Sequence, residues 1–180
     1  MRILKPFADA IARGAQTLET AVRGGDDDVV LDGFGRAVQL DHYSCGAQSA
    51  FMILRYFGKA RSIERTIKLL GTDADGTGIQ AMTTLFRARG LTPKRIKDGG
   101  KKDIRGAIED GHPVLVLLDD EEHWACVYGY GKGRVYLADP SPLDSPAVVV
   151  KWPDFKKRWG GKGAVVSPAT SAKSTRTGRK

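Results

Sequence analysis

The sequence predicts an α+β fold in which helices come first and antiparallel strands follow. Three observations lead to this expectation. Apolar residues between positions 47 and 57 recur at the spacing of one buried helical face. The stretch 113–118 is a continuous apolar run, which is typical of a buried strand. The stretches 123–130 and 134–138 are separated by Gly131-Lys132-Gly133, which favours an antiparallel hairpin.

Length and composition indicate one globular domain. The chain has 180 residues, of which 41% are hydrophobic and 28% charged, which is enough for a single core. No apolar run approaches the length of a membrane span, and the N-terminus lacks the apolar region of a signal peptide. Two cysteines do not make a disulfide framework. We therefore expect a cytoplasmic protein with reduced thiols, and we expect a monomer.

The predicted helix at 47–58 carries a cysteine at its tip. Ser44 is a suitable N-cap, because its hydroxyl can accept a hydrogen bond from a first-turn amide, and Gly58 suits the left-handed residue that ends a helix. Cys45 therefore lies in the first turn, where the helix dipole favours the thiolate. A cysteine in a core helix can also be simple packing. The polar residues before Cys45 and the glycine after it favour an exposed nucleophile.

The remaining elements follow from periodicity and turn residues. We expect further helices at 61–70, 80–89, 102–110 and 153–159, and strands at 113–118, 123–130, 134–138, 147–151 and, as a last edge strand, 163–166. The loop 71–78 contains an Asp-x-Asp-Gly pattern that resembles part of a calcium loop. It lacks the distal glutamate and the full spacing, so we expect neither a metal nor a cofactor.

A thiol nucleophile needs a base, and the base needs an orienting group. His123 begins one predicted strand and Asp139 directly follows the next. A hairpin between these strands would bring both residues to the same edge of the sheet. Cys45, His123 and Asp139 would then form the arrangement that a papain-like cysteine hydrolase uses.

These residues carry a resemblance to a known family. The string Gln39-x5-Cys45-Gly46-Ala47, followed by Gly76-Thr77, His123-Trp124 and Ala138-Asp139-Pro140, resembles the peptidase domain of bacteriocin-exporting ABC transporters. The resemblance covers about residues 38–166. That family is papain-like and cuts leader peptides after a double glycine. Two departures stand out: no transporter follows before Lys180, and a second cysteine lies three positions after the histidine.

The resemblance implies a role for each matching residue. It implies Cys45 as the nucleophile, His123 as the general base and acid, and Asp139 as the orienting group. It implies that the Gln39 side chain and the Cys45 amide form the oxyanion hole. It also implies that the remaining matches, Gly76, Thr77 and Trp124, border the substrate cleft.

We therefore expect a cysteine peptidase that cleaves peptide bonds through a thioester, after small residues such as Gly-Gly in a leader peptide. Two alternatives stay open. The same triad would serve a deamidase, a transglutaminase or a peptide ligase, which differ in the acceptor that reaches the thioester. A non-catalytic module that only recognises leader peptides would also keep the fold. The partners implied are a peptide or protein substrate and a separately encoded exporter.

Two features near His123 have more than one interpretation. Strand alternation places Cys126 on the face opposite His123, so we expect it to face away from Cys45 as a free core residue. The acidic run 119–122 is most simply a solvated turn. It would also favour protonated His123 and could attract a basic residue in a substrate.

The chain divides into an N-terminal helix and linker (1–30), a peptidase domain (31–166) and a disordered basic tail (167–180). The expected helix at 6–23 is amphipathic and ends at Gly24-Gly25, so it is either a structural helix with a linker or a partial imitation of a leader peptide. The tail carries four of the +8 formal charges but lacks interleaved aromatics, so no nucleic acid partner is expected.

Overall fold

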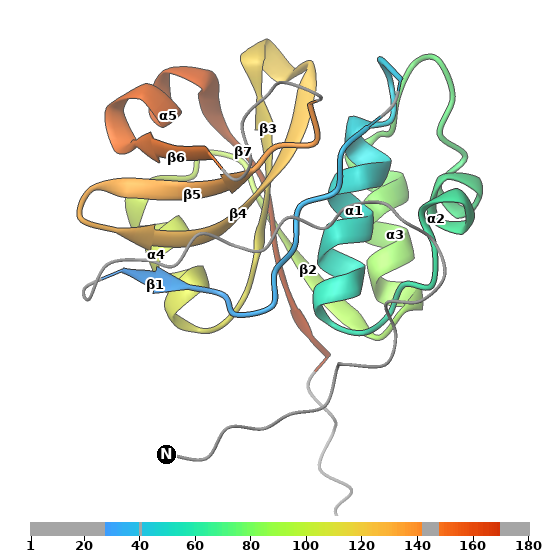
Figure 1. The fold of residues 1–180 in the computed structure, drawn as a ribbon, viewed down its shortest axis with the longest axis horizontal. Coiled ribbons are helices and arrows are strands. Elements are labelled where there is room, and N and C mark those ends of the chain that lie inside the picture. Colours follow the sequence, from blue (N-terminus) through green and yellow to red (C-terminus); the bar gives the residue numbers. More distant parts are fainter. Residues whose placement is uncertain (1–27, 40, 142–147, 170–180) are drawn as a thin grey trace, which may run out of the picture.

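The computed structural model describes residues 28–39, 41–141 and 148–169. Helices α1, α2 and α3 lie together on one side of the molecule, and the sheet with α4 and α5 lies on the other (Figure 1). The expected α+β order is therefore confirmed. The expected N-terminal helix at 6–23 lies outside the described residues, as do positions 170–180 of the basic tail.

The helical half is built around its first helix. It contains α1 (Cys45–Tyr56), α2 (Ile63–Leu70) and α3 (Ile79–Ala88). Every residue of α1 from Cys45 to Leu54 is buried, because α2, α3 and β4 all pack on it. Each large apolar side chain buried there contributes about 1.5–3 kcal/mol. This burial fixes the position of α1 and therefore of the cysteine at its tip.

The ends of α1 are formed differently from each other. Gly58 has a φ of 66° and ends the helix in the left-handed conformation, as expected. Ser44 is the N-cap residue, but the expectation for its hydroxyl is wrong, since that hydroxyl makes no cap hydrogen bond. The Asp41 carboxylate instead accepts hydrogen bonds from the backbone N–H groups of Tyr43 (3.0 Å) and Ser44 (2.7 Å). An aspartate turn therefore leads the chain into the helix.

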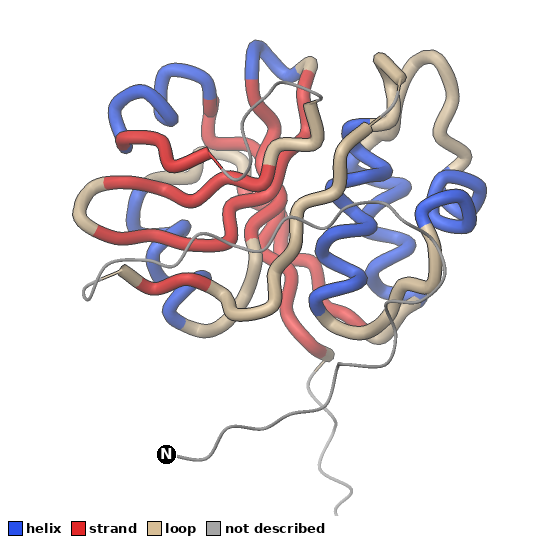
Figure 2. The backbone as a smooth tube through the Cα atoms, viewed as in Figure 1, coloured by secondary structure: helices blue, strands red, loops and turns tan. Residues whose placement is uncertain are grey.

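The sheet is antiparallel throughout, in the order β2-β7-β3-β4-β5-β6, and β1 pairs with β4 beyond the end of β3. Figure 2 shows these strands beside the helical half, in which α1 packs on β4 and α3 packs on β2. The strands are β1 (Val29–Val30), β2 (Leu91–Ile96), β3 (Val114–Leu118), β4 (His123–Gly131), β5 (Arg134–Ala138), β6 (Val148–Lys151) and β7 (Trp159–Pro168). The connections include α4 (Lys101–Glu109), the short 3-10 turn η1 (Asp119–Glu121) and α5 (Trp152–Arg158).

Three strands correct the expectations from sequence. β1 lies at the end of the stretch that was expected to be a helix and linker. β2 was not expected, because Pro93 and the charged residues after it hide a strand that lies at the edge of the sheet. The strand expected at 163–166 is longer, since β7 runs from Trp159 to Pro168, and it is not an edge strand, since it lies between β2 and β3. Its glycines interrupt the apolar pattern. Gly163 packs directly on the Leu115 backbone, which leaves no room for a side chain.

The second cysteine also needs a correction. Cys126 is free and fully buried, as expected, but it faces α1, where its Sγ donates to the Ser49 carbonyl at 3.4 Å. Strand alternation holds, because Trp124 lies on the same face as Cys126 and also packs on the first turn of α1. The error was the assumption that the helix packs on the face of β4 that carries His123.

Candidate active site

Cys45 is the first residue of α1, and its surroundings are narrow. The residue is only 8% exposed, so the expectation of an exposed cysteine is wrong and Cys45 is buried at the helix tip. A Cβ atom at the next residue, Gly46, would lie 2.8 Å from Thr77 Cβ and 3.0 Å from Trp124 Cδ1, so only glycine fits there. Gly76 has a φ of 87° and leads Thr77 into this contact. The structure therefore brings Gly76, Thr77 and Trp124 to the helix tip beside the thiol.

The partners of the thiol come from the β4–β5 hairpin. Lys132 and Gly133 both have positive φ values, 46° and 73°, as the two central residues of a type I′ turn require. Near this turn Gly131 pairs with Arg134 and Gly129 pairs with Tyr136. The expected hairpin is therefore present, and its turn lies at the expected place.

A β-bulge then changes the register toward the other end of the hairpin. The shift falls between Val127 and Gly129, after which Cys126 pairs with Ala138. If the pairing near the turn continued unchanged along the hairpin, Asp139 would pair with Cys126 and lie on the face of the sheet opposite to His123. In the shifted register it lies on the face of His123, because a slip of one residue exchanges the faces of a strand. The bulge is therefore what places the two side chains together.

The His123 and Asp139 side chains are in direct contact. His123 Nε2 lies 2.6 Å from Asp139 Oδ1, which also accepts the backbone N–H of Ser141 at 2.9 Å. Arg158 Nη2 lies 3.6 Å from the second carboxylate oxygen, Oδ2. The other ring nitrogen of His123 remains available for the Cys45 thiol, whose pKa the imidazole lowers.

These contacts shift the pKa values of the thiol and the imidazole toward an ion pair. Burial alone would raise the pKa of Cys45, but hydrogen bonds from His123 and from the backbone N–H groups of Trp124 and Gly46 outweigh it and lower that pKa. Burial would lower the pKa of His123, but the Asp139 and Cys45 side chains outweigh it and raise that pKa to about 9. The two shifts therefore favour a thiolate–imidazolium pair over a neutral thiol and a neutral imidazole.

The pKa of Asp139 is lowered as well. Burial opposes its ionisation, and the hydrogen bond to His123 outweighs that burial, with further help from the Ser141 amide and Arg158. The second cysteine behaves oppositely, since complete burial raises the pKa of Cys126. The pKa values of the two thiols are therefore shifted in opposite directions, downward for Cys45 and upward for Cys126.

Gln39 lies at the end of the segment that leads to the helix tip. It is buried, and its Nε2 donates to the Asp41 carbonyl at 2.7 Å, which leaves the second N–H of the amide for another acceptor. Its backbone N–H donates to the Pro140 carbonyl at 2.8 Å. Gln39 is therefore attached to the loop that follows Asp139, and its role at an oxyanion stays a prediction.

The acidic run before His123 is more structured than a solvated turn. Asp119, Asp120 and Glu121 all have positive φ, which is rare for residues other than glycine. Asp119 accepts two hydrogen bonds from Arg158, at 2.8 and 2.6 Å, and Glu121 pairs with Lys162. Two of the four acids are therefore paired, which corrects the expectation of a purely solvated run.

The sequence reasoning missed three residues around Asp139, namely Arg36, Ser141 and Arg158. Arg36 donates to the backbone carbonyl of Asp139, and the backbone N–H of Ser141 donates to the Asp139 carboxylate. Arginines that bind loops have no distinctive spacing, so no local pattern could have separated Arg36 or Arg158 from the surface arginines. Ser141 follows the Asp-Pro pair, where a turn in which the aspartate accepts a nearby amide is a general expectation.

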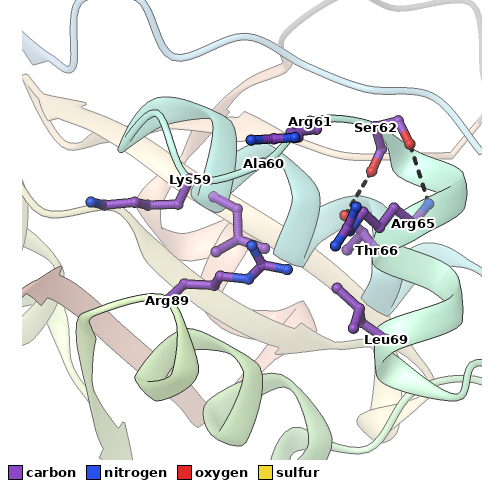
Figure 3. A pocket seen from close by; sticks show the side chains of 9 residues that line it. Lys59, Ala60, Arg61, Ser62, Arg65, Thr66, Leu69 and Arg89 are labelled. Carbon is purple, nitrogen blue, oxygen red and sulfur yellow. Dashed lines mark hydrogen bonds between the residues drawn. The ribbon is translucent and has the colours of Figure 1, made fainter.

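Other features of the described residues do not add to this site. The described residues contain no cluster of His, Cys, Asp or Glu that could hold a metal ion. None of their helices has the length and apolar character needed to cross a membrane. A small hollow near the C-terminal end of α1 is lined by polar and basic residues such as Lys59, Arg61 and Arg89 (Figure 3). It contains none of the residues around Cys45, which lies at the opposite end of the helix.

A buried helix that carries a cysteine at its tip, followed by an antiparallel sheet that carries histidine and aspartate, is the architecture of the papain-like class. The fold of this chain is of that class. Within it, the chain belongs to the Peptidase C39 family, whose model matches residues 35–171.

Similar proteins agree with this placement. The lactococcin-G-processing and transport ATP-binding protein LagD of Lactococcus lactis subsp. lactis is 28% identical over 130 residues, which are 68% of this chain and 17% of LagD. The pediocin PA-1 transport/processing ATP-binding protein PedD of Pediococcus acidilactici is 24% identical over 144 residues, 78% of this chain and 20% of PedD. The chain thus spans no more than about a fifth of the length of these relatives.

Solved structures share the fold. The peptidase domain of Streptococcus ComA, a bifunctional ABC transporter involved in a quorum-sensing pathway, superimposes with a TM-score of 0.64 at 19% identity, covering 73% of this chain and 96% of that domain. A double-glycine-motif protease from an AMS/PCAT transporter, in complex with its leader peptide, gives 0.62 at 20% identity, with 74% and 91% covered. A C39-like peptidase from Bacillus anthracis gives 0.65 at 17% identity, with 82% and 100% covered.

Proposed function

We propose that this protein is a cysteine peptidase in which Cys45, His123 and Asp139 form the catalytic triad. The observation that carries the proposal is the position of the His123 imidazole, which contacts Asp139 at 2.6 Å through Nε2 and has its other nitrogen available for the Cys45 thiol. The opposite pKa shifts of the thiol and the imidazole agree with this arrangement. Membership in a peptidase family supports it. The proposed site lies within the part of the chain that the family model matches.

The proposed reaction begins from the thiolate–imidazolium pair. The Cys45 sulfur attacks the carbonyl carbon of the scissile peptide bond, and the oxygen becomes an oxyanion. The free N–H of the Gln39 amide and the Cys45 backbone N–H stabilise that oxyanion. His123 then gives its proton to the leaving amine, which breaks the C–N bond and leaves a thioester. Water, deprotonated by His123, hydrolyses the thioester and regenerates the thiol.

We also propose that the substrate is a leader peptide cut after Gly-Gly and that an exporter is a partner of this chain. Similarity to LagD, a lactococcin-G-processing and transport protein, and to PedD, a pediocin PA-1 transport/processing protein, supports this assignment. Thr77 and Trp124 lie close against Gly46, the residue after Cys45, and this narrow surrounding supports small residues before the cut.

The test is cleavage of a peptide that contains a Gly-Gly site by wild type, Cys45→Ala and Cys126→Ala. The second variant is the matched control, because it removes the other thiol, which is fully buried in the core. We expect wild type and Cys126→Ala to cleave after Gly-Gly and Cys45→Ala to be inactive. Equal cleavage by Cys45→Ala would rule out the proposed nucleophile.

Mass spectrometry of the products separates the proposed hydrolysis from other acyl transfers. Hydrolysis adds one water across the peptide bond and gives two fragments. A gain of about one mass unit on a glutamine would indicate deamidation, and a new amide would indicate ligation or transglutamination. Binding of the leader without any product, by an enzyme that also resists alkylation at Cys45, would indicate a recognition module.

A further inference from the structure

Arg36 is a buried arginine behind the proposed triad. It lies in the segment that crosses from β1 to α1, which Figure 2 shows as a tan loop running from the sheet half to the helical half. The residue is 6% exposed. Its Nε donates to the carbonyl oxygen of Asp139 at 2.6 Å, and its Nη2 donates to the carbonyl oxygen of Ser141 at 2.5 Å.

The same crossing segment completes the set of contacts. The backbone N–H of Gln39 donates to the Pro140 carbonyl at 2.8 Å. Three consecutive carbonyl groups, those of residues 139, 140 and 141, are therefore held by two residues of one short segment. A planar guanidinium can serve two of these acceptors at once, and the point charge of a lysine cannot reproduce that geometry.

These bonds fix the backbone of Asp139 but leave its carboxylate to other partners. The carboxylate Oδ1 contacts His123 and accepts the Ser141 N–H. The position of that N–H depends in turn on the loop that Arg36 holds. Both the backbone and the carboxylate of Asp139 are thus fixed relative to the segment that carries Gln39.

We infer that Arg36 is a positioning residue of the active site: it holds Asp139 behind His123 and keeps the Gln39 segment and the Asp139 loop in one fixed relation. This inference rests on the proposed function. The two hydrogen bonds that carry this inference go to backbone carbonyls, so the role assigned to Arg36 is positioning and not catalysis. Arg158 differs from it, because Arg158 approaches the Asp139 carboxylate itself.

The charged groups that face His123 determine what its displacement would do. They are Cys45 at the tip of α1, Asp139 after β5 and Asp119 in η1. If the Asp139 loop moves, the imidazolium loses its nearest hydrogen-bonded anion. The thiolate–imidazolium pair is then populated over a narrower pH range, and the orientation of the ring is lost.

The test compares Arg36→Met and Arg36→Lys with wild type in peptide cleavage across pH. Arg36→Met keeps the apolar stem and removes the donors. We expect a fall in kcat of about 10- to 100-fold with KM within about twofold, since a displacement of about 1 Å can cost that much and Arg36 does not touch substrate. The alkaline limb should move to lower pH. Arg36→Lys should recover only part of kcat.

Arg134→Met is the matched control. Arg134 also lies on the hairpin and binds an acceptor of the N-terminal segment, Asp28, at 3.3 Å, but it does so at the turn end. We expect this variant to melt at a lower temperature and to keep the wild-type kcat and pH limb. A folded Arg36→Met with unchanged kcat and alkaline limb would overturn the inference. If Arg36→Met does not fold, a folded Arg36→Lys with the wild-type kcat and the wild-type alkaline limb would overturn the inference as well.

A second readout needs no peptide substrate. The rate of Cys45 alkylation by iodoacetamide reports thiolate formation, and its pH midpoint should rise in both Arg36 variants and stay at the wild-type value in Arg134→Met. Identical midpoints in wild type and folded Arg36 variants would contradict the inference. Absence of peptide cleavage by wild type, with a midpoint that does rise in the Arg36 variants, would reject the proposed function and keep the positioning role.

Discussion

The two ends of the β4–β5 hairpin are built by different means. At the turn end, Lys132 and Gly133 supply the left-handed conformations of a two-residue turn, and the strands pair in regular register. At the other end, the register has shifted by one residue and His123 and Asp139 depend on contacts from elsewhere in the chain. The structure of the turn end is determined by the residues of the turn itself. The other end is positioned by long-range contacts and carries the proposed chemistry.

The segment 28–39, which precedes α1, contacts both ends of the β4–β5 hairpin through side chains of opposite charge. At the turn end the Asp28 carboxylate accepts a hydrogen bond from the Tyr136 hydroxyl at 2.5 Å and pairs with Arg134. At the active end the Arg36 guanidinium binds the Asp139 loop. Changes at the turn end should therefore lower the free energy of unfolding without lowering activity, whereas changes at the active end should lower activity.

The largest expected effect follows from Asp139→Asn. The amide cannot stabilise the imidazolium, so kcat should fall by about 10²- to 10⁴-fold. Wild-type activity should be bell-shaped in pH, rising as Cys45 ionises below its ordinary pKa and falling as His123 loses its proton near pH 9. Because the pKa of His123 is raised by Asp139, the falling limb should move to lower pH in the variant.

The measurement is kcat/KM for a Gly-Gly peptide from pH 5 to pH 10. Arg134→Met at the turn end is the control and should keep both limbs. A falling limb that stays near pH 9 in Asp139→Asn would show that the carboxylate does not stabilise the imidazolium.

A pair of glycine substitutions gives an intermediate effect. A Cβ at Gly129, beside the bulge, would lie 2.9 Å from Tyr136 Cδ2 and 3.0 Å from Tyr136 Cβ, so Gly129→Ala should cost about 1–3 kcal/mol of unfolding free energy. It should also lower activity, because any relaxation of the bulge moves Asp139 relative to His123. Gly133→Ala introduces a left-handed alanine in open space and should cost about 1–2 kcal/mol without loss of activity.

Urea unfolding and kcat, measured on the same preparations, test this pair. Equal loss of kcat in both variants would contradict the difference between the two ends of the hairpin.

The smallest expected effect concerns the two acids of the turn before His123 that are not in an ion pair. Asp120 and Glu122 are exposed, whereas Asp119 and Glu121 pair with Arg158 and Lys162. Neutralising Asp120 and Glu122 together removes negative potential near the thiolate–imidazolium pair, so both limbs should move to lower pH. The shift should be only a few tenths of a unit, because salt screens exposed charges.

The double variant Asp120→Asn with Glu122→Gln is compared with wild type at low and high salt. A shift that is equally large at both salt concentrations would contradict a screened surface effect. A higher KM for peptides with a basic residue would support attraction of such substrates by this turn.

The sequence was sufficient for the parts of the fold that local chemistry determines. The periodicity of α1, the cap at Gly58 and the turn at 131–133 have local causes, and they correctly placed Cys45 at a helix tip and His123 and Asp139 at one sheet edge. The bulge near Tyr128 could not be predicted, because it becomes visible only when two strands are paired.

Other features depended on packing between distant segments. β2 was missed because its charged residues are tolerated only at the edge of the sheet. β7 was misplaced because it contains glycines, one of which lies so close to the Leu115 backbone that no side chain would fit. Arg36 looks like any other arginine until its acceptors, more than 100 positions later, are known. The residues that carry chemistry were therefore easier to predict than the residues that hold them in place.

The most direct test of the central claim compares the two cysteines within one molecule. At pH 6, with Cys45 paired to His123 and Cys126 fully buried with a raised pKa, iodoacetamide should modify Cys45 alone. In His123→Ala the modification of Cys45 at pH 6 should become slow and recover only as the pH approaches the ordinary thiol pKa of about 8.5. Rates of Cys45 alkylation that are the same in wild type and His123→Ala at pH 6 would contradict the thiolate–imidazolium pair on which the proposed mechanism depends.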